Sequence, residues 1–321
     1  MADGHQTSAF QGLPAVPLGM GGSFYGVGTS RPEEAALQAA LEGALASGIT
    51  HFDTATDYGA GASERRLGQF LSAGLGRRGR VFLASKANLD EVSAAAALRA
   101  VDASLERLGT DVIDLYYLHW PRTGHDLRPW MEGLERARQQ GKIRAVGVSN
   151  FSVAQMRQLS EAGRIDACQI GYNLLWRFPE AGVLPYCVDQ GIAVVAYSAL
   201  AHGILAGRYE PHLTFAPDDQ RWTISLFRPD VWPQVYAAVQ EFVALAARAG
   251  VPLATLALRW LLSRPGVGAV LVSARSPEQV RANVRALEAS IPAGTLDELT
   301  ALSDGARVGI PDDGNPFGYH P

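Results

Sequence analysis

Short apolar runs recur along the chain and alternate with longer segments whose apolar residues follow helical spacing. Alternation of strand and helix is typical of a parallel sheet. The runs are nearly all apolar, as expected of strands that are buried on both faces. We count eight of them: VPLGMGG (16–22), THFDTA (50–55), RVFLASK (80–86), DVIDLYYLH (111–119), IRAVGVSN (143–150), ACQIGYN (167–173), IAVVAYS (192–198) and VGAVLVS (267–273).

Glycines mark the ends of the intervening helical segments. Glu33 to Ser47 is followed by Gly48, and Val92 to Leu108 by Gly109. Glycine readily adopts the left-handed conformation that closes a helix, so we expect helices over both ranges. Eight strand–helix repeats in 321 residues favour a closed (β/α)₈ TIM barrel. An open doubly wound sheet is the alternative, but no G-x-G-x-x-G motif follows an early strand.

Composition indicates one large domain. The chain is 47% apolar and 19% charged, which allows a large buried core. We expect the barrel domain over residues 13–310 after a flexible N-terminus at 1–12. The final segment, 311–321, is rich in proline and glycine and is expected to form an irregular tail.

One long segment, Leu200 to Pro233, breaks the alternation after the seventh strand. It carries prolines, glycines and aromatic residues without a clear period. Loops of this length are usually functional, and this one follows a strand end on the rim where barrel active sites lie. We expect a lid over a ligand. The alternative is a surface excursion packed on the barrel.

Four ionisable residues lie at or after the ends of three predicted strands. Asp53 and Tyr58 belong to HFDTATDYG, Lys86 ends VFLASK, and His119 ends DLYYLH. The carboxyl ends of parallel barrel strands share one rim, so these side chains are expected to meet there. An ammonium lowers the pKa of a neighbouring phenol by favouring the phenolate. We therefore expect Lys86, held by Asp53, to make Tyr58 a proton donor, although any one of these groups alone would more often be structural.

Charge and cysteine content exclude several classes of function. The net charge is −4 and no basic stripe is present, so nucleic acid is not an expected partner. Cys168 and Cys187 fall on a predicted strand and helix, which fits buried thiols in a reducing compartment. The sequence has neither a signal-peptide pattern nor an uninterrupted apolar run long enough for a membrane span. We expect a cytoplasmic location.

Five motifs resemble those of the aldo-keto reductases: HFDTATDYGAGASERRLG, DLYYLHWP, GKIRAVGVSNF, AYSALAHGILAGRY and LVSARSPEQVRAN. They occur in the order of that family, and the resemblance covers residues 13–283. It implies a (β/α)₈ reductase that uses NADPH or NADH. By position, Tyr58 would protonate the carbonyl oxygen, Lys86 paired with Asp53 would tune it, and His119 would orient the carbonyl. Hydride attack builds negative charge on that oxygen, which donors from Tyr58 and His119 would stabilise without a metal.

The resemblance also implies where the nicotinamide would bind. Ser149, Asn150 and Gln169 offer hydroxyl and amide groups at two adjacent strand ends and would hold its carboxamide. Tyr197 would stack on the ring and so fix the face that delivers hydride. A core position is the structural alternative for Tyr197. Backbone groups further along would follow the pyrophosphate, at Ser198, Leu200 and Gly203.

The loop after the eighth strand carries the expected phosphate-binding cation, Arg275. A guanidinium can clamp a 2′-phosphate bidentately, and in the family a cation here accompanies use of NADPH. We favour NADPH, with NADH as the alternative cofactor and Arg281 as an alternative cation. Val272 and Ser273 replace the Pro and Gly of the family's common PGAR form. The further cofactor contacts are expected from Ser273, Gln279 and Asn283.

Aromatic residues on predicted rim segments could line a pocket for a small carbonyl substrate, although each could equally serve packing. They are Phe24, Tyr25, Trp120, Trp176, Phe178 and Trp222. The pattern does not predict the physiological substrate, the reaction direction or the oligomeric state.

Two other functions remain open. One is a non-catalytic regulatory subunit that binds nucleotide, resembling the potassium-channel β subunits. The other is a metal-dependent hydrolase, which would need clustered ligands at strand ends. His51 stands at the start of its strand and His119 is alone at the end of another, so we expect no metal site.

Overall fold

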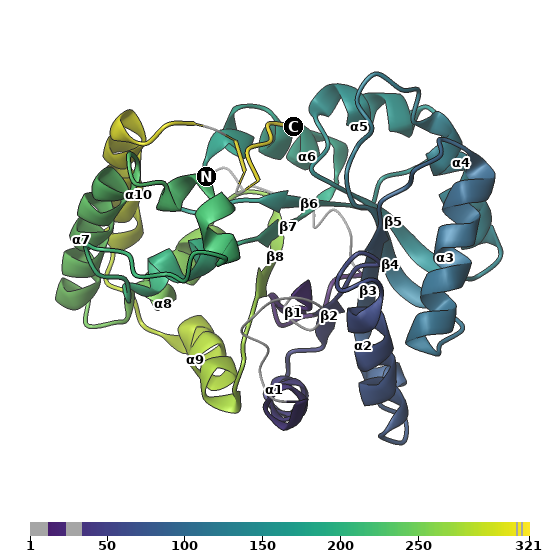
Figure 1. Cartoon of the computed structure of the whole chain (residues 1–321), viewed down its shortest axis with the longest axis horizontal. Coiled ribbons are helices and arrows are strands. Elements are labelled where there is room, and N and C mark those ends of the chain that lie inside the picture. Colours follow the sequence, from purple (N-terminus) through teal and green to yellow (C-terminus); the bar gives the residue numbers. More distant parts are fainter. Residues whose placement is uncertain (1–11, 24–33, 313, 316) are drawn as a thin grey trace, which may run out of the picture.

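The computed structural model describes residues 12–23, 34–312, 314–315 and 317–321. Eight parallel strands form a closed barrel in sequential order (Figure 1). Because β1 also pairs with β8, the sheet has no open edge, and the TIM barrel is confirmed over the open sheet. The strands are β1 Leu18–Gly21, β2 His51–Asp53, β3 Phe82–Ala87, β4 Ile113–Leu118, β5 Ile143–Ser149, β6 Ala167–Gly171, β7 Ala193–Tyr197 and β8 Val267–Val272.

Helices surround the barrel on all sides in Figure 1. Two of them, α7 and α10, pack against each other and against α8, outside the regular ring. The helices are α1 Glu34–Ala46, α2 Ala62–Ser72, α3 Ala94–Leu108, α4 Arg128–Gln139, α5 Val153–Ser160, α6 Val183–Gln190, α7 Trp232–Arg248, α8 Leu253–Leu262, α9 Pro277–Glu288 and α10 Thr295–Gly309.

The two predicted glycine caps are confirmed, with φ of 83° at Gly48 and 61° at Gly109. The predicted start of α3 was two residues too early. The Ser93 side chain accepts a hydrogen bond from the backbone N–H of Ala96, so Ser93 is the cap and the helix begins after it. In α1 the last turn ends at Ala46, one residue before the predicted end.

Side chains along each strand alternate between the barrel interior and the surrounding helices. The interior cluster consists of Ala84, Leu115, Tyr117, Ala145, Ala167 and Ala193. By the same alternation, interior positions two or four residues further along these strands belong to Lys86, His119, Ser149, Gln169 and Tyr197. The fold therefore gathers polar side chains at the carboxyl end of a small, apolar barrel interior.

Gly147 shows how tightly this interior is filled. A Cβ atom added there would lie 2.2 Å from Cδ1 of Tyr117 on the neighbouring strand β4. The ring of Tyr117 thus takes the space that a side chain at Gly147 would need.

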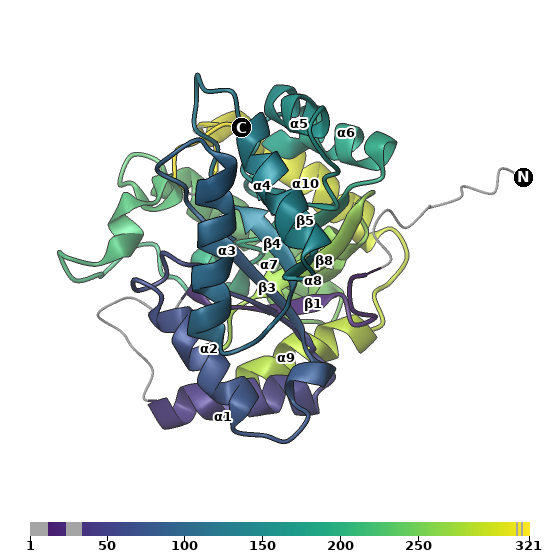
Figure 2. The same cartoon turned by 90° about the vertical axis from the view of Figure 1, so that its right-hand side faces the viewer.

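The segment after β7 is more ordered than a bare loop. It contains the short 3₁₀ helices η4 Ala201–Ala206, η5 Gln220–Thr223 and η6 Ser225–Phe227, and its last two predicted residues, 232 and 233, begin α7. Proline at the start of a helix is favourable because its missing N–H has no helical partner there. Aromatic rings pack edge to face along the segment, at Tyr209, Phe215, Phe227 and Trp232. Figure 2 shows this green segment extending at the left of the molecule.

The chain after α10 turns back toward the centre of the molecule, as its yellow trace shows in Figure 1. The described residues of 311–321 include neither helix nor strand. Asn315 is nevertheless completely buried. The C-terminal tail, which we define as residues 311–321, is therefore irregular in backbone but anchored at one side chain.

No single helix in the described ranges is long and apolar enough to cross a membrane; only the bent pair α7 and α8 reaches that length and composition together. Within the same ranges, no three or more His, Cys, Asp and Glu side chains are arranged to hold a metal ion.

Candidate active site

Asp53 and Lys86 form a buried ion pair at the carboxyl end of the barrel. Their side chains are 2% and 1% exposed, and Nζ of Lys86 donates to Oδ1 of Asp53. Nζ also donates to the carbonyl oxygen of Thr54 at 3.0 Å, and Nε2 of Gln169 donates to Oδ2 of Asp53 at 2.8 Å. Both carboxylate oxygens are thus satisfied, which is what a charge pair needs to persist away from water. The predicted pairing is present.

Tyr58 lies beside this pair, with its ring centroid 5.1 Å from Nζ of Lys86. The expected lowering of its pKa is wrong for this structure. Burial raises the pKa of the Tyr58 phenol well above its ordinary value, and the negative charges of Asp53 and Asp57 raise it further. The ammonium of Lys86, which is paired with Asp53, does not outweigh the effect of burial on this pKa. The phenol is therefore protonated at neutral pH and can act as a donor.

His119 is also a neighbour of Tyr58, with ring centroids 5.8 Å apart and nearly perpendicular planes. Its Nδ1 lies 3.1 Å from Oδ1 of Asp57, a residue that the sequence analysis did not single out. Burial lowers the pKa of the His119 imidazole, and the hydrogen bond to Asp57 opposes this only in part. Burial alone would raise the pKa of the Asp57 carboxyl, but the hydrogen bond and charge of His119 bring it below its ordinary value.

Asp57 could have been found from its position. It directly precedes Tyr58 in the sequence, so the turn that delivers the phenol also delivers a carboxylate. Its second oxygen, Oδ2, accepts a hydrogen bond from Nδ2 of Asn88 at 3.2 Å. Asp57 is 42% exposed at its side chain, whereas that of His119 is 9% exposed. The carboxylate therefore sits between the buried imidazole and solvent.

The expected nicotinamide-binding side chains also come together. Nδ2 of Asn150 donates to Oγ of Ser149 at 3.0 Å and to the carbonyl oxygen of His119 at 3.2 Å. The hydroxyl of Tyr197 donates to Oδ1 of Asn150 at 2.8 Å. Gln169 is the strand partner of Ser149. Asn150 has a φ of 64°, a costly conformation for a residue with a side chain, and such residues cluster at functional sites.

The C-terminal tail contacts the side chains expected to bind the nicotinamide. No sequence motif indicated this contact. Nδ2 of Asn315 lies 3.2 Å from the hydroxyl oxygen of Tyr197 and 3.3 Å from Oδ1 of Asn150. Oδ1 of Asn315 accepts hydrogen bonds from the backbone N–H groups of Phe317 and Tyr319. A side-chain carboxamide is thus already bound here, so the donor and acceptor set fits a group of this chemistry.

The segment after β7 begins with strained backbone. Ser198 has a φ of 54°, and its carbonyl oxygen accepts from Nδ2 of Asn173 at 2.9 Å. The N–H of Gly203 donates to the carbonyl oxygen of Leu200 at 2.8 Å, and Gly203 has a φ of 92°. These residues, expected along the pyrophosphate, follow Tyr197 directly on the same rim of the barrel.

The expected phosphate-binding loop lies at the N-terminus of α9. Ser273 and Arg275 are exposed, and Ser276 caps the helix. The backbone N–H of Arg275 donates to Oε1 of Gln279 at 2.7 Å. Asn283, one turn further, is 8% exposed. An exposed guanidinium beside a helix N-terminus is a favourable place for a phosphate group.

Among the described residues predicted for the substrate pocket, Trp120 lies beside His119. Its ring centroid is 6.1 Å from that of His119, and 5.7 Å and 5.4 Å from those of Phe317 and Tyr319 in the C-terminal tail. Phe24 and Tyr25 lie outside the described residues. Trp222 packs on Phe215, with centroids 5.0 Å apart, inside the segment after β7.

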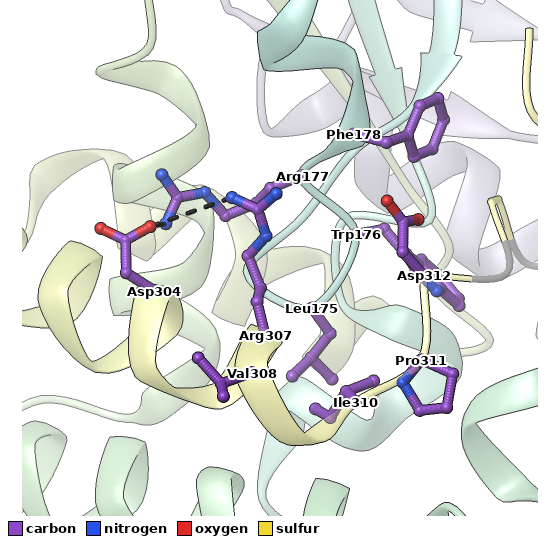
Figure 3. A pocket seen from close by; sticks show the side chains of 10 residues that line it. All are labelled: Leu175, Trp176, Arg177, Phe178, Asp304, Arg307, Val308, Ile310, Pro311 and Asp312. Atoms are coloured by element: carbon purple, nitrogen blue, oxygen red, sulfur yellow. Dashed lines mark hydrogen bonds and ion pairs between the residues drawn. The ribbon is translucent and has the colours of Figure 1, made fainter.

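Trp176 and Phe178 line a separate pocket of about 200 Å³, drawn in Figure 3. Arg177 of this pocket pairs with Asp304 of α10 at 2.7 Å. None of its lining residues is Asp53, Tyr58, Lys86 or His119. This pocket is therefore distinct from the cluster of these four side chains, although Trp176 also contacts His202, with ring centroids 6.2 Å apart.

Comparison with known proteins gives one consistent result. The model of the aldo/keto reductase family matches residues 17–304. Aldo-keto reductase YhdN of Bacillus subtilis (strain 168) is 35% identical over 285 residues, 84% of this chain and 85% of that protein. The NADH-specific methylglyoxal reductase of Escherichia coli (strain K12) is 32% identical, covering 76% of this chain and 80% of that protein.

Solved structures show the same likeness. A glycerol dehydrogenase from Gluconobacter oxydans has a TM-score of 0.83 and 30% identity, covering 94% of this chain and 96% of that one. An aldo-keto reductase from Klebsiella pneumoniae in complex with NADPH has a TM-score of 0.71 and 31% identity, covering 89% and 90%. The chain belongs to the aldo/keto reductase family.

Proposed function

We propose that the protein is a cytoplasmic oxidoreductase that transfers a hydride reversibly between NADPH and the carbonyl of an aldehyde, ketone or sugar. The observation that carries this proposal is the convergence of four groups at the barrel rim. Lys86 pairs with Asp53 and lies 5.1 Å from the Tyr58 ring, and the Tyr58 and His119 rings are 5.8 Å apart. A phenol donor next to an imidazole is suited to a carbonyl oxygen that gains negative charge.

Each residue has a defined task in this proposal. Bound NADPH supplies the hydride. Burial raises the pKa of the Tyr58 phenol and so keeps it protonated. The phenol gives this proton to the developing alkoxide. Lys86, fixed by Asp53 and the carbonyl oxygen of Thr54, stabilises the phenolate that remains. His119, whose ring lies beside that of Tyr58, orients the substrate.

The proposed cofactor contacts come from strand ends and from the loops that follow them. Ser149, Asn150 and Gln169 would bind the nicotinamide carboxamide, and the ring of Tyr197 would stack on the nicotinamide. Backbone groups at Ser198, Leu200 and Gly203 would contact the pyrophosphate. Ser273, Arg275, Gln279 and Asn283 would bind the adenosine end. The Klebsiella relative was solved with NADPH and the Escherichia relative is described as NADH-specific, so both cofactors belong in the test.

The test is a fluorescence titration with NADPH and NADH, followed by absorbance at the reduced-nicotinamide band while aldehydes, ketones and sugars are added. Tight NADPH binding with oxidation by a carbonyl compound supports the proposal. Binding without any turnover would instead favour the regulatory subunit considered from the sequence. Failure to bind either nucleotide would contradict both.

Replacing Arg275 with Ala is expected to weaken NADPH binding by roughly 10- to 100-fold and to leave NADH binding nearly unchanged, because charge-assisted hydrogen bonds to the 2′-phosphate are lost. Titration of both nucleotides measures this. Arg281→Ala is the matched control, since Arg281 pairs with Glu278 at 2.7 Å on the same helix. If Arg281→Ala changed the preference and Arg275→Ala did not, the assignment of the cation would be wrong.

Replacing Asn315 with Ala is expected to tighten NADPH binding by roughly 2- to 10-fold, the range of one or two neutral hydrogen bonds. The reason is competition, because the Asn315 carboxamide occupies Oδ1 of Asn150, where the nicotinamide carboxamide would bind, and also contacts the hydroxyl of Tyr197, whose ring would stack on the nicotinamide. Phe317→Ala, at an exposed tail residue, is the control. Weaker binding by Asn315→Ala would show that the tail supports the cofactor instead of competing with it.

A further inference from the structure

Asp57 places a negative charge beside the two side chains that the proposed function assigns to the carbonyl oxygen. Its Oδ1 lies 3.1 Å from Nδ1 of His119, and the ring centroids of His119 and Tyr58 are 5.8 Å apart. An aspartate carboxyl ordinarily loses its proton near pH 4, so Asp57 is ionised at neutral pH. In this site its pKa lies below the ordinary value, because the hydrogen bond and charge of His119 outweigh the effect of burial.

The other ionisable groups of this cluster do not cancel the charge of Asp57. Lys86 and Asp53 form an ion pair of opposite formal charges, so the pair carries no net charge. An imidazole ordinarily loses its proton near pH 6.5, and burial lowers the pKa of His119, so its ring is neutral at pH 8. The phenol of Tyr58 is protonated and neutral. The five side chains together therefore carry one net negative charge, which belongs to Asp57.

The carboxylate of Asp57 is held in place and lies toward solvent. Its second oxygen, Oδ2, accepts a hydrogen bond from Nδ2 of Asn88 at 3.2 Å, so both oxygens have a partner. The side chain of Asp57 is 42% exposed, whereas that of His119 is 9% exposed. A substrate whose carbonyl oxygen contacts Tyr58 and His119 must therefore bind next to this fixed charge. Any anionic group close to its carbonyl is then within the distance over which charges act on each other in water, about 8 Å at physiological ionic strength.

We infer, on the basis of the proposed function, that Asp57 is a specificity-determining residue that excludes carbonyl compounds carrying a carboxylate or phosphate near the carbonyl. Neutral aldehydes, ketones and sugars are then the preferred substrates, and oxo acids and phosphorylated aldehydes are poor ones. The cause is repulsion between like charges. For two unit charges about 7 Å apart, at an effective dielectric constant of about 20 to 80, this repulsion corresponds to a factor of roughly 3 to 50 in kcat/KM.

The kinetic test compares 4-oxobutanoate with its methyl ester, because both are the same straight-chain aldehyde and only the first is an anion. The measured quantity is the ratio of kcat/KM for the ester to kcat/KM for the anion, at pH 8, low salt and saturating NADPH. Asp57→Asn is expected to lower this ratio by roughly 3- to 50-fold, mainly by raising kcat/KM for the anion. The substitution keeps the size and planar shape of the side chain and removes its charge.

Salt distinguishes an effect of charge from an effect of shape. The screening length in water falls from about 30 Å at 0.01 M salt to about 3 Å at 1 M. The ratio of ester to anion should therefore fall with rising salt in the unchanged protein and stay nearly constant in Asp57→Asn. A purely structural role of Asp57 would not give this dependence.

Asp90→Asn is the matched control, because it makes the same chemical change at an exposed residue of the loop after β3 and should leave the ratio nearly unchanged. The inference is overturned if the unchanged protein prefers the anion, if Asp57→Asn leaves the ratio as it was, or if the ratio of the unchanged protein does not respond to salt. If neither the ester nor any other neutral carbonyl compound oxidised NADPH, the proposed function would be contradicted, and the inference with it.

Discussion

Replacing Tyr58 with Phe is expected to lower kcat for carbonyl reduction by roughly 100- to 10,000-fold, the usual contribution of a positioned general acid. The substitution removes one oxygen atom and leaves the ring that packs against His119 and lies 5.1 Å from Nζ of Lys86. The barrel and the cofactor contacts should therefore be unaffected. Steady-state kinetics with NADPH and a carbonyl substrate measure the loss.

Measuring NADPH binding distinguishes a loss of catalysis from a general loss of structure in Tyr58→Phe. Tyr58→Phe should bind NADPH as the unchanged protein does, because Ser149, Asn150 and Tyr197 are not altered. Tyr186→Phe makes the same chemical change on α6, where Tyr186 stacks with Arg157, and should keep full activity. Activity retained by Tyr58→Phe would mean that another group protonates the carbonyl oxygen.

Replacing Asp53 with Ala is expected to lower the free energy of unfolding by about 3–5 kcal/mol, the range measured when one partner of a buried ion pair is removed. The Lys86 side chain is 1% exposed and would keep only the carbonyl oxygen of Thr54 as a hydrogen-bond partner. Nε2 of Gln169 would lose its acceptor as well. Urea denaturation followed by circular dichroism measures the change.

Two further variants serve as controls for the Asp53→Ala experiment. Arg99→Ala removes a surface pair whose side chains are 65% and 64% exposed, and should change stability by less than about 1 kcal/mol. The double replacement of Asp53 by Leu and Lys86 by Met should be less destabilising than Asp53→Ala, since no charge is left buried. A loss for Asp53→Ala as small as that for Arg99→Ala would contradict the buried pair.

Much of the fold could be predicted from the sequence because its signals are local. Apolar runs marked the eight strands, and glycines at positions 48 and 109 marked two helix ends. The error at the start of α3 arose because Ser93 provides a cap that the apolar spacing does not reveal. In the segment after β7, aromatic packing between Tyr209, Phe227 and Trp232 gives order that has no periodic pattern.

The candidate site was predictable where strand ends determined it. Alternation along the strands places Asp53, Lys86 and His119 on one rim, and the structure brings them together with Tyr58. The direction of the shift in the Tyr58 pKa was not predictable, because it depends on burial and on the negative charges of Asp53 and Asp57 around the phenol. Asn315 contacts Asn150, which is 165 positions away in the sequence, and local sequence patterns do not predict such a contact.

Isotope transfer tests the central claim most directly. The protein is mixed with NADPH that carries deuterium at both C4 positions of the nicotinamide, together with hydroxyacetone or another carbonyl compound that the panel identifies. The alcohol product is then examined by mass spectrometry. The account predicts one deuterium on the carbon that was the carbonyl carbon, present with the unchanged protein and absent with Tyr58→Phe on the same time scale. NADPH bound tightly but no deuterium in any product would contradict a hydride-transfer function.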